Sequence, residues 1–130
     1  MMRVTYLTSF GMALWLAAGA AWGQAPSSPP YTKAQAQAGA ALYTQNCAMC
    51  HGDAVMGRTL LKPGTTPTVG GIFTIMTTNM PLNQPGSLSH EQYEDILAYA
   101  LQKNGHQASN QPLKYDQALT SAQAFVNKKQ

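Results

Sequence analysis

The chain contains two cysteines, and both belong to one short run in which a histidine directly follows the second cysteine. Cys47 and Cys50 are separated by two residues, and His51 comes next. Thiols at this spacing can form thioethers with the two vinyl groups on one edge of a porphyrin, and the adjacent imidazole can bind its iron. This is the c-type haem attachment pattern. Gly52 follows and leaves room for the chain to pass close to the macrocycle. The run predicts one covalently attached haem c per chain.

The same residues allow two other kinds of chemistry. A Cys-x-x-Cys pair can cycle between dithiol and disulfide in a thiol-disulfide oxidoreductase, where it opens a helix within a βαβ unit. Here a helix is predicted ahead of the pair, and no strand pattern is evident. Zinc binding would crowd three ligands onto one turn and would require another from His90 or His106. Haem attachment is therefore the preferred interpretation, with thiol chemistry and zinc binding as alternatives.

The first residues of the chain read as a secretory signal peptide covering 1–23. Arg3 provides a basic start, the run 4–22 contains no charged residue, and small residues lie at its end. We expect cleavage between Gly23 and Gln24 and a periplasmic location. An uncleaved membrane anchor is the alternative, because the apolar run approaches the ~18–20 residues that can span a bilayer.

The exported chain is predicted to be one small domain of modest charge. Removal of the signal takes away Arg3, so that seven Lys and Arg remain against five Asp and Glu, and the formal charge falls from +3 to +2. This surplus is too small to indicate nucleic-acid binding. Both tryptophans are lost with the signal, which leaves few aromatic residues for a core. A buried haem would supply the missing apolar mass.

A first helix is predicted just ahead of the cysteine run. Residues 24–31 are rich in proline and uncharged, which is typical of a flexible leader. Thr32 and Gln35 then form a capping box, and the alanine-rich sequence continues to about Asn46. Gly39 in the middle of a helix is unfavourable by about 1 kcal/mol relative to alanine. Its presence predicts that another helix crosses closely at this position.

A second helix is predicted later in the chain, and it is the strongest secondary-structure signal in the sequence. Ser89 and Gln92 form a second capping box, and Asn104 with Gly105 ends the helix. Apolar residues recur at the spacing of one helical face. The residues of this apolar stripe are Tyr93, Ile96, Leu97, Ala100 and Leu101.

Between the two helices the sequence is rich in glycine and proline. Over 52–88 we expect irregular structure with one or two helical turns in 72–76. So long an irregular stretch is understandable when it wraps around a large prosthetic group. The predicted domain covers 32–106, and 107–130 is expected to be a C-terminal extension with room for one short helix.

With these elements placed, the chain from Thr32 to Gly105 resembles the class I monohaem c-type cytochromes. More narrowly, it is similar to the small periplasmic cytochromes and cytochrome subunits that serve quinoprotein-type dehydrogenases. The resemblance implies an all-α cytochrome c fold, in which N- and C-terminal helices cross and loops wrap around one covalently bound haem. The chain departs from the family in the loop from Pro67 to Met80. Its twelve intervening residues make this loop shorter than that of most members. The residues that carry the resemblance are Gly39, Tyr43, the Cys-x-x-Cys-His run, Ile96, Tyr99, and the segment from Met80-Pro81 to Asn104-Gly105.

The resemblance also implies the iron ligands. His51 would be the proximal ligand and Met80 the distal ligand, because the Met-Pro pair and its distance from the cysteines match the family. Met76 is the rival thioether, four residues earlier. His90 and His106 are the imidazole alternatives.

In this family a proline carbonyl accepts a hydrogen bond from the proximal histidine, and Pro67 resembles that proline better than Pro63 does. The implied function is that of an electron carrier, not an enzyme, that receives electrons from a dehydrogenase. The acceptor would be an oxidase or another cytochrome. Membrane contact is expected only through an uncleaved signal or a membrane-bound partner. A haem-based sensor with a labile Met80 ligand is the alternative.

Overall fold

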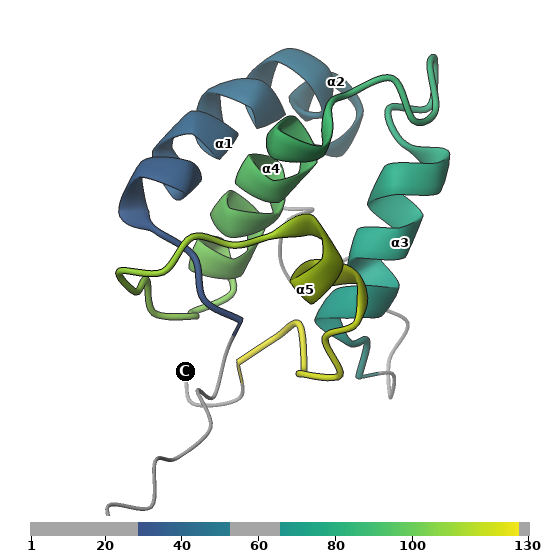
Figure 1. Ribbon diagram of the computed structural model, residues 1–130. Coiled ribbons are helices and arrows are strands. Elements are labelled where there is room, and N and C mark those ends of the chain that lie inside the picture. Colours follow the sequence, from purple (N-terminus) through teal and green to yellow (C-terminus); the bar gives the residue numbers. More distant parts are fainter. Residues whose placement is uncertain (1–28, 53–65, 128–130) are drawn as a thin grey trace, which may run out of the picture.

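The computed structural model describes residues 29–52 and 66–127 (Figure 1). The predicted signal peptide, most of the leader and the segment 53–65 lie outside the described residues. The described residues form helices and contain no strand, apart from an isolated bridge between Thr68 and Ala124. No described helix combines the length and the apolar character that a bilayer crossing requires. The helices are α1 (Lys33–Asn46), α2 (Ala48–His51), α3 (Val69–Asn79), α4 (His90–Lys103) and α5 (Tyr115–Leu119).

The two longest helices begin at the predicted capping boxes. The Thr32 hydroxyl accepts the backbone N–H of Gln35 at 3.1 Å, and the Gln35 side chain accepts the N–H of Thr32 at 3.2 Å. Ser89 and Gln92 repeat this exchange at the start of α4, at 3.2 and 2.9 Å. Each cap satisfies backbone donors that the first helical turn cannot pair, which stabilises a helix by about 1 kcal/mol. Both predicted helices are therefore confirmed.

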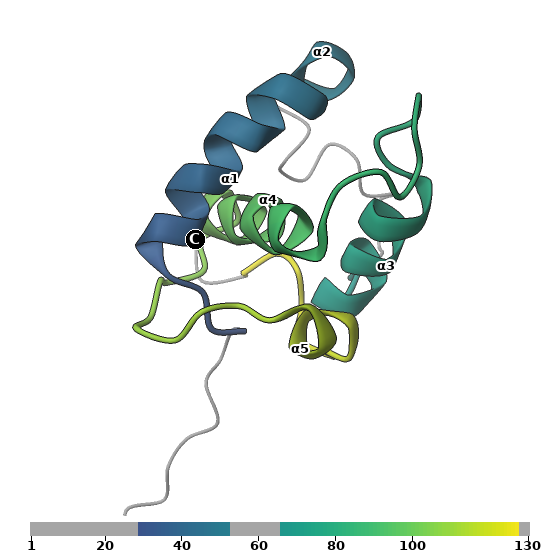
Figure 2. The ribbon, with the colours of Figure 1, turned by 45° about the horizontal axis from the view of Figure 1, so that its top comes forward.

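The predicted close crossing of these helices is also confirmed (Figure 2). Gly39 on α1 is buried, and a Cβ at this position would lie 1.8 Å from the carbonyl oxygen of Asp95 on α4. One turn further, the rings of Tyr43 and Tyr99 meet with their centroids 5.6 Å apart. Only a residue without a side chain allows the two backbones to approach this closely.

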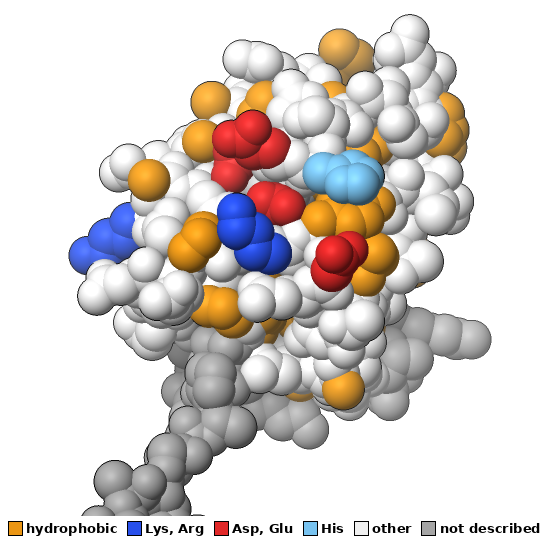
Figure 3. Space-filling model, in the orientation of Figure 1, with side chains coloured by type: hydrophobic (Ala, Val, Ile, Leu, Met, Phe, Trp, Pro, Cys, Tyr) orange, Lys and Arg blue, Asp and Glu red, His pale blue; other side chains and the backbone are white. Residues whose placement is uncertain are grey.

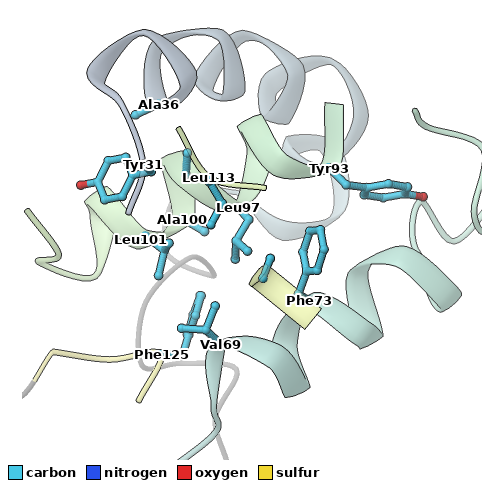
Figure 4. Packing of buried hydrophobic residues seen from close by; sticks show 12 residues of the cluster. Tyr31, Ala36, Val69, Phe73, Tyr93, Leu97, Ala100, Leu101, Leu113 and Phe125 are labelled. Carbon is cyan, nitrogen blue, oxygen red and sulfur yellow. The ribbon is translucent and has the colours of Figure 1, made fainter. Parts of the chain in front are cut away.

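One hydrophobic core lies between α4 and the elements around it (Figure 4). The predicted stripe of α4 is buried, with Leu97 and Leu101 fully inaccessible to solvent. α1 contributes a single alanine, so most of the remaining core comes from α3 and from the chain after α4. The clustered residues are Tyr31, Ala36, Val69, Phe73, Tyr93, Leu97, Ala98, Ala100, Leu101, Leu113, Ala118 and Phe125.

α3 is longer than the one or two turns predicted, because it runs from Val69 to Asn79. The Thr68 hydroxyl caps it by accepting the N–H of Gly71 at 3.0 Å. Gly70 brings the helix against the end of α5, since a Cβ there would lie 2.4 Å from the carbonyl oxygen of Leu119. Contacts with residues far away in the sequence stabilise this helix. Two consecutive glycines lower its intrinsic helix propensity, so the sequence does not predict its full length.

The C-terminal segment, predicted as an extension beyond residue 106, packs against the core. It contains the predicted short helix, α5, and its Leu113 and Phe125 are buried in the core. The backbone N–H of Val69 donates to the carbonyl of Gln123 at 2.8 Å, which joins the segment to the start of α3. The fold therefore extends through the described chain to residue 127.

Tyr31, the last residue of the predicted leader, is packed into the fold. Tyr31 is fully buried, and its hydroxyl donates to the carbonyl oxygen of His106. The backbone N–H of Ser109 donates to the carbonyl of Tyr31 at 2.7 Å. The residue just ahead of α1 is therefore fixed to the chain that follows α4.

Candidate haem-binding site

The cysteine run forms a single helical turn that continues from α1. Cys47 precedes α2 as its N-cap, and its backbone N–H donates to the carbonyl of Tyr43 at 2.8 Å. The N–H of His51 then donates to the carbonyl of Cys47 at 2.9 Å. Residues three and four apart on a helical turn share a face. Cys50 and His51 thus each lie about one helical turn from Cys47.

The end of the turn is held by a glycine and a tyrosine. Gly52 has φ of 55°, a conformation that residues with a side chain rarely adopt. The Tyr43 hydroxyl donates to the carbonyl of Gly52 at 2.7 Å. Because Tyr43 is itself buried in the crossing of α1 and α4, this hydrogen bond ties the turn to the helix pair. The sequence indicates the aromatic side chain at the crossing but not the use of its hydroxyl.

The two thiols are free and differ in exposure. Cys47 is half-buried and Cys50 is exposed. Burial raises the pKa of the Cys47 thiol, whereas a nucleophilic cysteine needs a lowered pKa. For zinc, no three His, Cys, Asp or Glu side chains come together as a metal site within 29–52 and 66–127. Neither His90 nor His106 therefore completes a zinc site with the cysteine run.

The two candidate methionines have different surroundings. Met76 packs against the hydrophobic core, which is the common role of a methionine. Met80 is half-buried, terminates α3 as its C-cap, and is not among the side chains that pack against the core. Its carbonyl accepts the Tyr93 hydroxyl at 2.6 Å, and Figure 4 shows the Tyr93 ring directed away from the rest of the cluster. Tyr93 thus joins the core of α4 to the segment that follows α3, a role that its place in the apolar stripe does not reveal.

The two imidazole alternatives are engaged elsewhere. His90 is exposed and stacks on Tyr115, with ring centroids 3.7 Å apart. His106 is buried, and its Nε2 lies 2.8 Å from the carbonyl oxygen of Phe125. Both histidines contribute to the packing of the C-terminal segment.

Pro67 lies two residues ahead of α3, and its carbonyl is used in the fold. Its carbonyl accepts the backbone N–H of Phe125 at 2.9 Å. Among the described residues no hydrogen bond joins His51 to this carbonyl. Pro67 therefore serves the pairing between the start of α3 and the C-terminal segment. The rival, Pro63, lies outside the described residues.

α2 and the segment 80–88 lie at the same end of the molecule in both ribbon views (Figures 1 and 2). The cysteine run enters this end from α1, and Met80 enters it from α3. The cysteine run thus supplies two free thiols and the imidazole of His51, and the end of α3 supplies the thioether of Met80. A helical pair crossing behind a Cys-x-x-Cys-His turn is the architecture of a c-type cytochrome domain.

The comparison with protein families agrees. The family model described as cytochrome c oxidase, cbb3-type, subunit III, matches residues 34–99, which is half of the 130-residue chain, and the chain belongs to this family. No curated protein matches the chain, and neither does any solved structure.

The chain is accordingly a monohaem c-type cytochrome with covalently bound haem c. It is an electron-transfer protein rather than an enzyme, and its partners are redox proteins. The described residues fit such a group, since free thiols and an imidazole lie on one helical turn whose end is fixed by Tyr43. The haem supplies an iron that accepts and releases one electron, and the chain supplies its attachment and ligands.

Proposed function

We propose that the chain is an exported electron carrier in which Cys47 and Cys50 form the thioethers and His51 and Met80 are the axial ligands. The observation that carries the choice of Met80 is its contrast with Met76. The side chain of Met76 is used in core packing, whereas the Met80 side chain is not, and its backbone is held by Tyr93.

This ligand pair accounts for electron transfer without catalysis. His51 and Met80 would both hold the iron, and no position on it would then be left for a substrate. A thioether ligand favours the reduced state and raises the reduction potential relative to two imidazoles. The Tyr43 and Tyr93 hydroxyls hold the backbone next to each ligand, so neither ligand segment needs to move when an electron arrives or leaves.

Absorption spectra of Met80→Ala and Met76→Ala holoproteins test the ligand assignment. We expect wild type and Met76→Ala to keep the far-red sulfur-to-iron band of the oxidised form, and Met80→Ala to lose it. The potential of Met80→Ala should fall by on the order of 0.1 V or more, since axial ligands set haem potentials over about 0.8 V. Met76→Ala should instead lose about 1–3 kcal/mol of stability, because it vacates core volume.

Other outcomes redirect the assignment. Loss of the band in Met76→Ala alone would make Met76 the ligand. A wild-type protein without the band, whose reduced form binds carbon monoxide, would indicate a haem-based sensor with a labile ligand. A colourless protein made with haem-ligation machinery would contradict attachment at the cysteine run.

We also propose a periplasmic location and a dehydrogenase as electron donor. The signal-like residues 1–23 support export, and the similarity to cytochromes that serve quinoprotein-type dehydrogenases supports the donor. The mature protein purified from a periplasmic fraction should have the mass of a chain beginning at Gln24 plus one haem. A quinoprotein dehydrogenase with its substrate should reduce it. A membrane-retained chain of full length, or no reduction, would contradict the respective proposal.

A further inference from the structure

Three large apolar side chains are exposed among the described residues, and two of them flank the proposed haem site. Met49 is 96% exposed and lies between the two cysteines. Leu82 is 76% exposed and lies two residues after Met80. The third, Ile75, is 50% exposed on α3. Side chains of this size at such exposure gain stability when a partner covers them.

The segment that carries Leu82 is exposed and therefore accessible to a partner protein. Residues 82–87 are all exposed, and the segment 80–88 extends past the end of α3 in both ribbon views (Figures 1 and 2). It shares that end of the molecule with α2, which carries Met49. The two exposed apolar side chains thus come from the two segments that hold the proposed thioethers and distal ligand.

The described residues at this end of the molecule are also uncharged. No Lys, Arg, Asp or Glu occurs in 34–52 or in 66–89. In the face that Figure 3 shows, red and blue side chains gather over α4 and the chain before and within α5, and the part that carries the segment 80–88 shows none. The charged side chains in the described chain are Lys33, Glu91, Glu94, Asp95, Lys103, Lys114 and Asp116.

From the coincidence of exposed apolar side chains and absent charge, we infer that Met49 and Leu82 form a docking surface for a redox protein. The partner surface it fits is uncharged and apolar around that protein's own redox centre. A charged partner patch would lose hydration here and gain no opposite charge in return. The inference rests on the proposed function, since it places the contact beside the haem held by Cys47, Cys50 and Met80.

The consequence is an encounter that is not steered by charge. Steered association between proteins falls steeply as salt is added, whereas contact between uncharged surfaces does not. Asp53, Arg58 and Lys62 lie in the segment outside the described residues, and the salt dependence of the whole protein includes their effect.

Electron self-exchange between oxidised and reduced copies of the holoprotein tests the inference, because each copy presents the proposed surface to the other. The rate is measured from the broadening of haem methyl resonances in mixed samples. Between about 0.01 M and 1 M salt the Debye length falls from about 30 Å to about 3 Å. We expect the wild-type rate constant to change by less than about twofold over this range.

Substitutions in the proposed surface distinguish the effect of apolar contact on the self-exchange rate from the effect of charge. Leu82→Glu and Met49→Glu place like charges on both copies, and each should lower the rate about tenfold at low salt, with recovery as salt is added. Leu82→Gln should lower the rate at every salt concentration, because it removes apolar area without adding charge. Gln111→Glu, an exposed position on the chain before α5, is the matched control and should leave the rate unchanged.

A strongly salt-dependent wild-type rate would overturn the inference, and so would equal rates for Leu82→Glu and Gln111→Glu. A stable dimer in solution would also overturn it, by assigning the surface to contact between copies. The far-red band is recorded for every variant first. Its loss in wild type would indicate failure of the proposed ligation, not of the docking surface.

Discussion

Three tyrosines each bury a ring and use the hydroxyl to hold a distant stretch of backbone. Tyr31 donates to the carbonyl of His106, Tyr43 to Gly52 and Tyr93 to Met80. Each ring is nearly inaccessible to solvent. A phenol can fill core volume and satisfy a carbonyl at the same time, which suits a chain with few aromatic residues. Two of the three hydrogen bonds position the segments that carry the proposed ligands.

Tyr31→Phe should reveal the hydrogen bond at the start of the fold through the pH dependence of stability. Burial raises the pKa of Tyr31 above its ordinary value, so the folded state retains the proton that the unfolded state releases. This contribution is complete below about pH 10 and is lost as the pH rises through the higher folded pKa. The variant should be about 1–2 kcal/mol less stable than wild type at neutral pH. The difference should shrink above pH ~10. Urea unfolding across this range measures it, and a difference that stays constant would contradict the role of the hydroxyl.

At the scale of elements, local signals predicted α1 and α4 well and the others less well. Each of those helices begins at a capping box, α4 also has an apolar stripe, and Gly39 indicates their crossing. α3 has a pair of glycines in its first turn and depends on the chain around Gln123, far away in sequence, for its first backbone partners. Its length was therefore underestimated.

The candidate site also has one feature that the sequence predicts and one that it does not. The Cys-x-x-Cys-His turn is a short-range motif and is readable from the sequence. The partner of the Pro67 carbonyl is the N–H of Phe125, which no local pattern indicates.

Gly39→Ala tests the helix crossing directly. The added methyl group would meet the carbonyl oxygen of Asp95 at 1.8 Å, so the two helices must separate. We expect a loss of about 2–4 kcal/mol in the free energy of unfolding. Gly71→Ala is the control, because that glycine is exposed on α3 and the new Cβ would meet only the Thr68 hydroxyl, at 3.2 Å. It should change stability by less than about 1 kcal/mol, and equal effects of the two substitutions would contradict the crossing.

At the scale of the whole molecule, the domain has two differently built ends. One end carries α2 and the segment 80–88 and is free of charged side chains in the described chain. The other is closed by the C-terminal segment, whose Leu113 and Phe125 complete the core. This segment lies beyond the residues that match the family, 34–99. The residues that close this end of the core are therefore outside the family match.

Leu113→Ala measures how much that closure contributes. Leu113 is fully buried, and its loss should lower the free energy of unfolding by about 2–5 kcal/mol. Leu82→Ala makes the same chemical change at a side chain that is 76% exposed, and it should cost less than about 1 kcal/mol. Thermal unfolding of both holoproteins makes the comparison. A small effect at Leu113 would mean that the C-terminal segment only lies on the surface.

The position of these closing residues in the chain sets an order of events during maturation. Under the proposed export, the cysteine run leaves the translocation pore well before Leu113 and Phe125 do. The core that those residues complete cannot form in the meantime. Under that proposal the thiols of Cys47 and Cys50 would be exported while the core is still incomplete, at a stage when they are accessible to haem attachment.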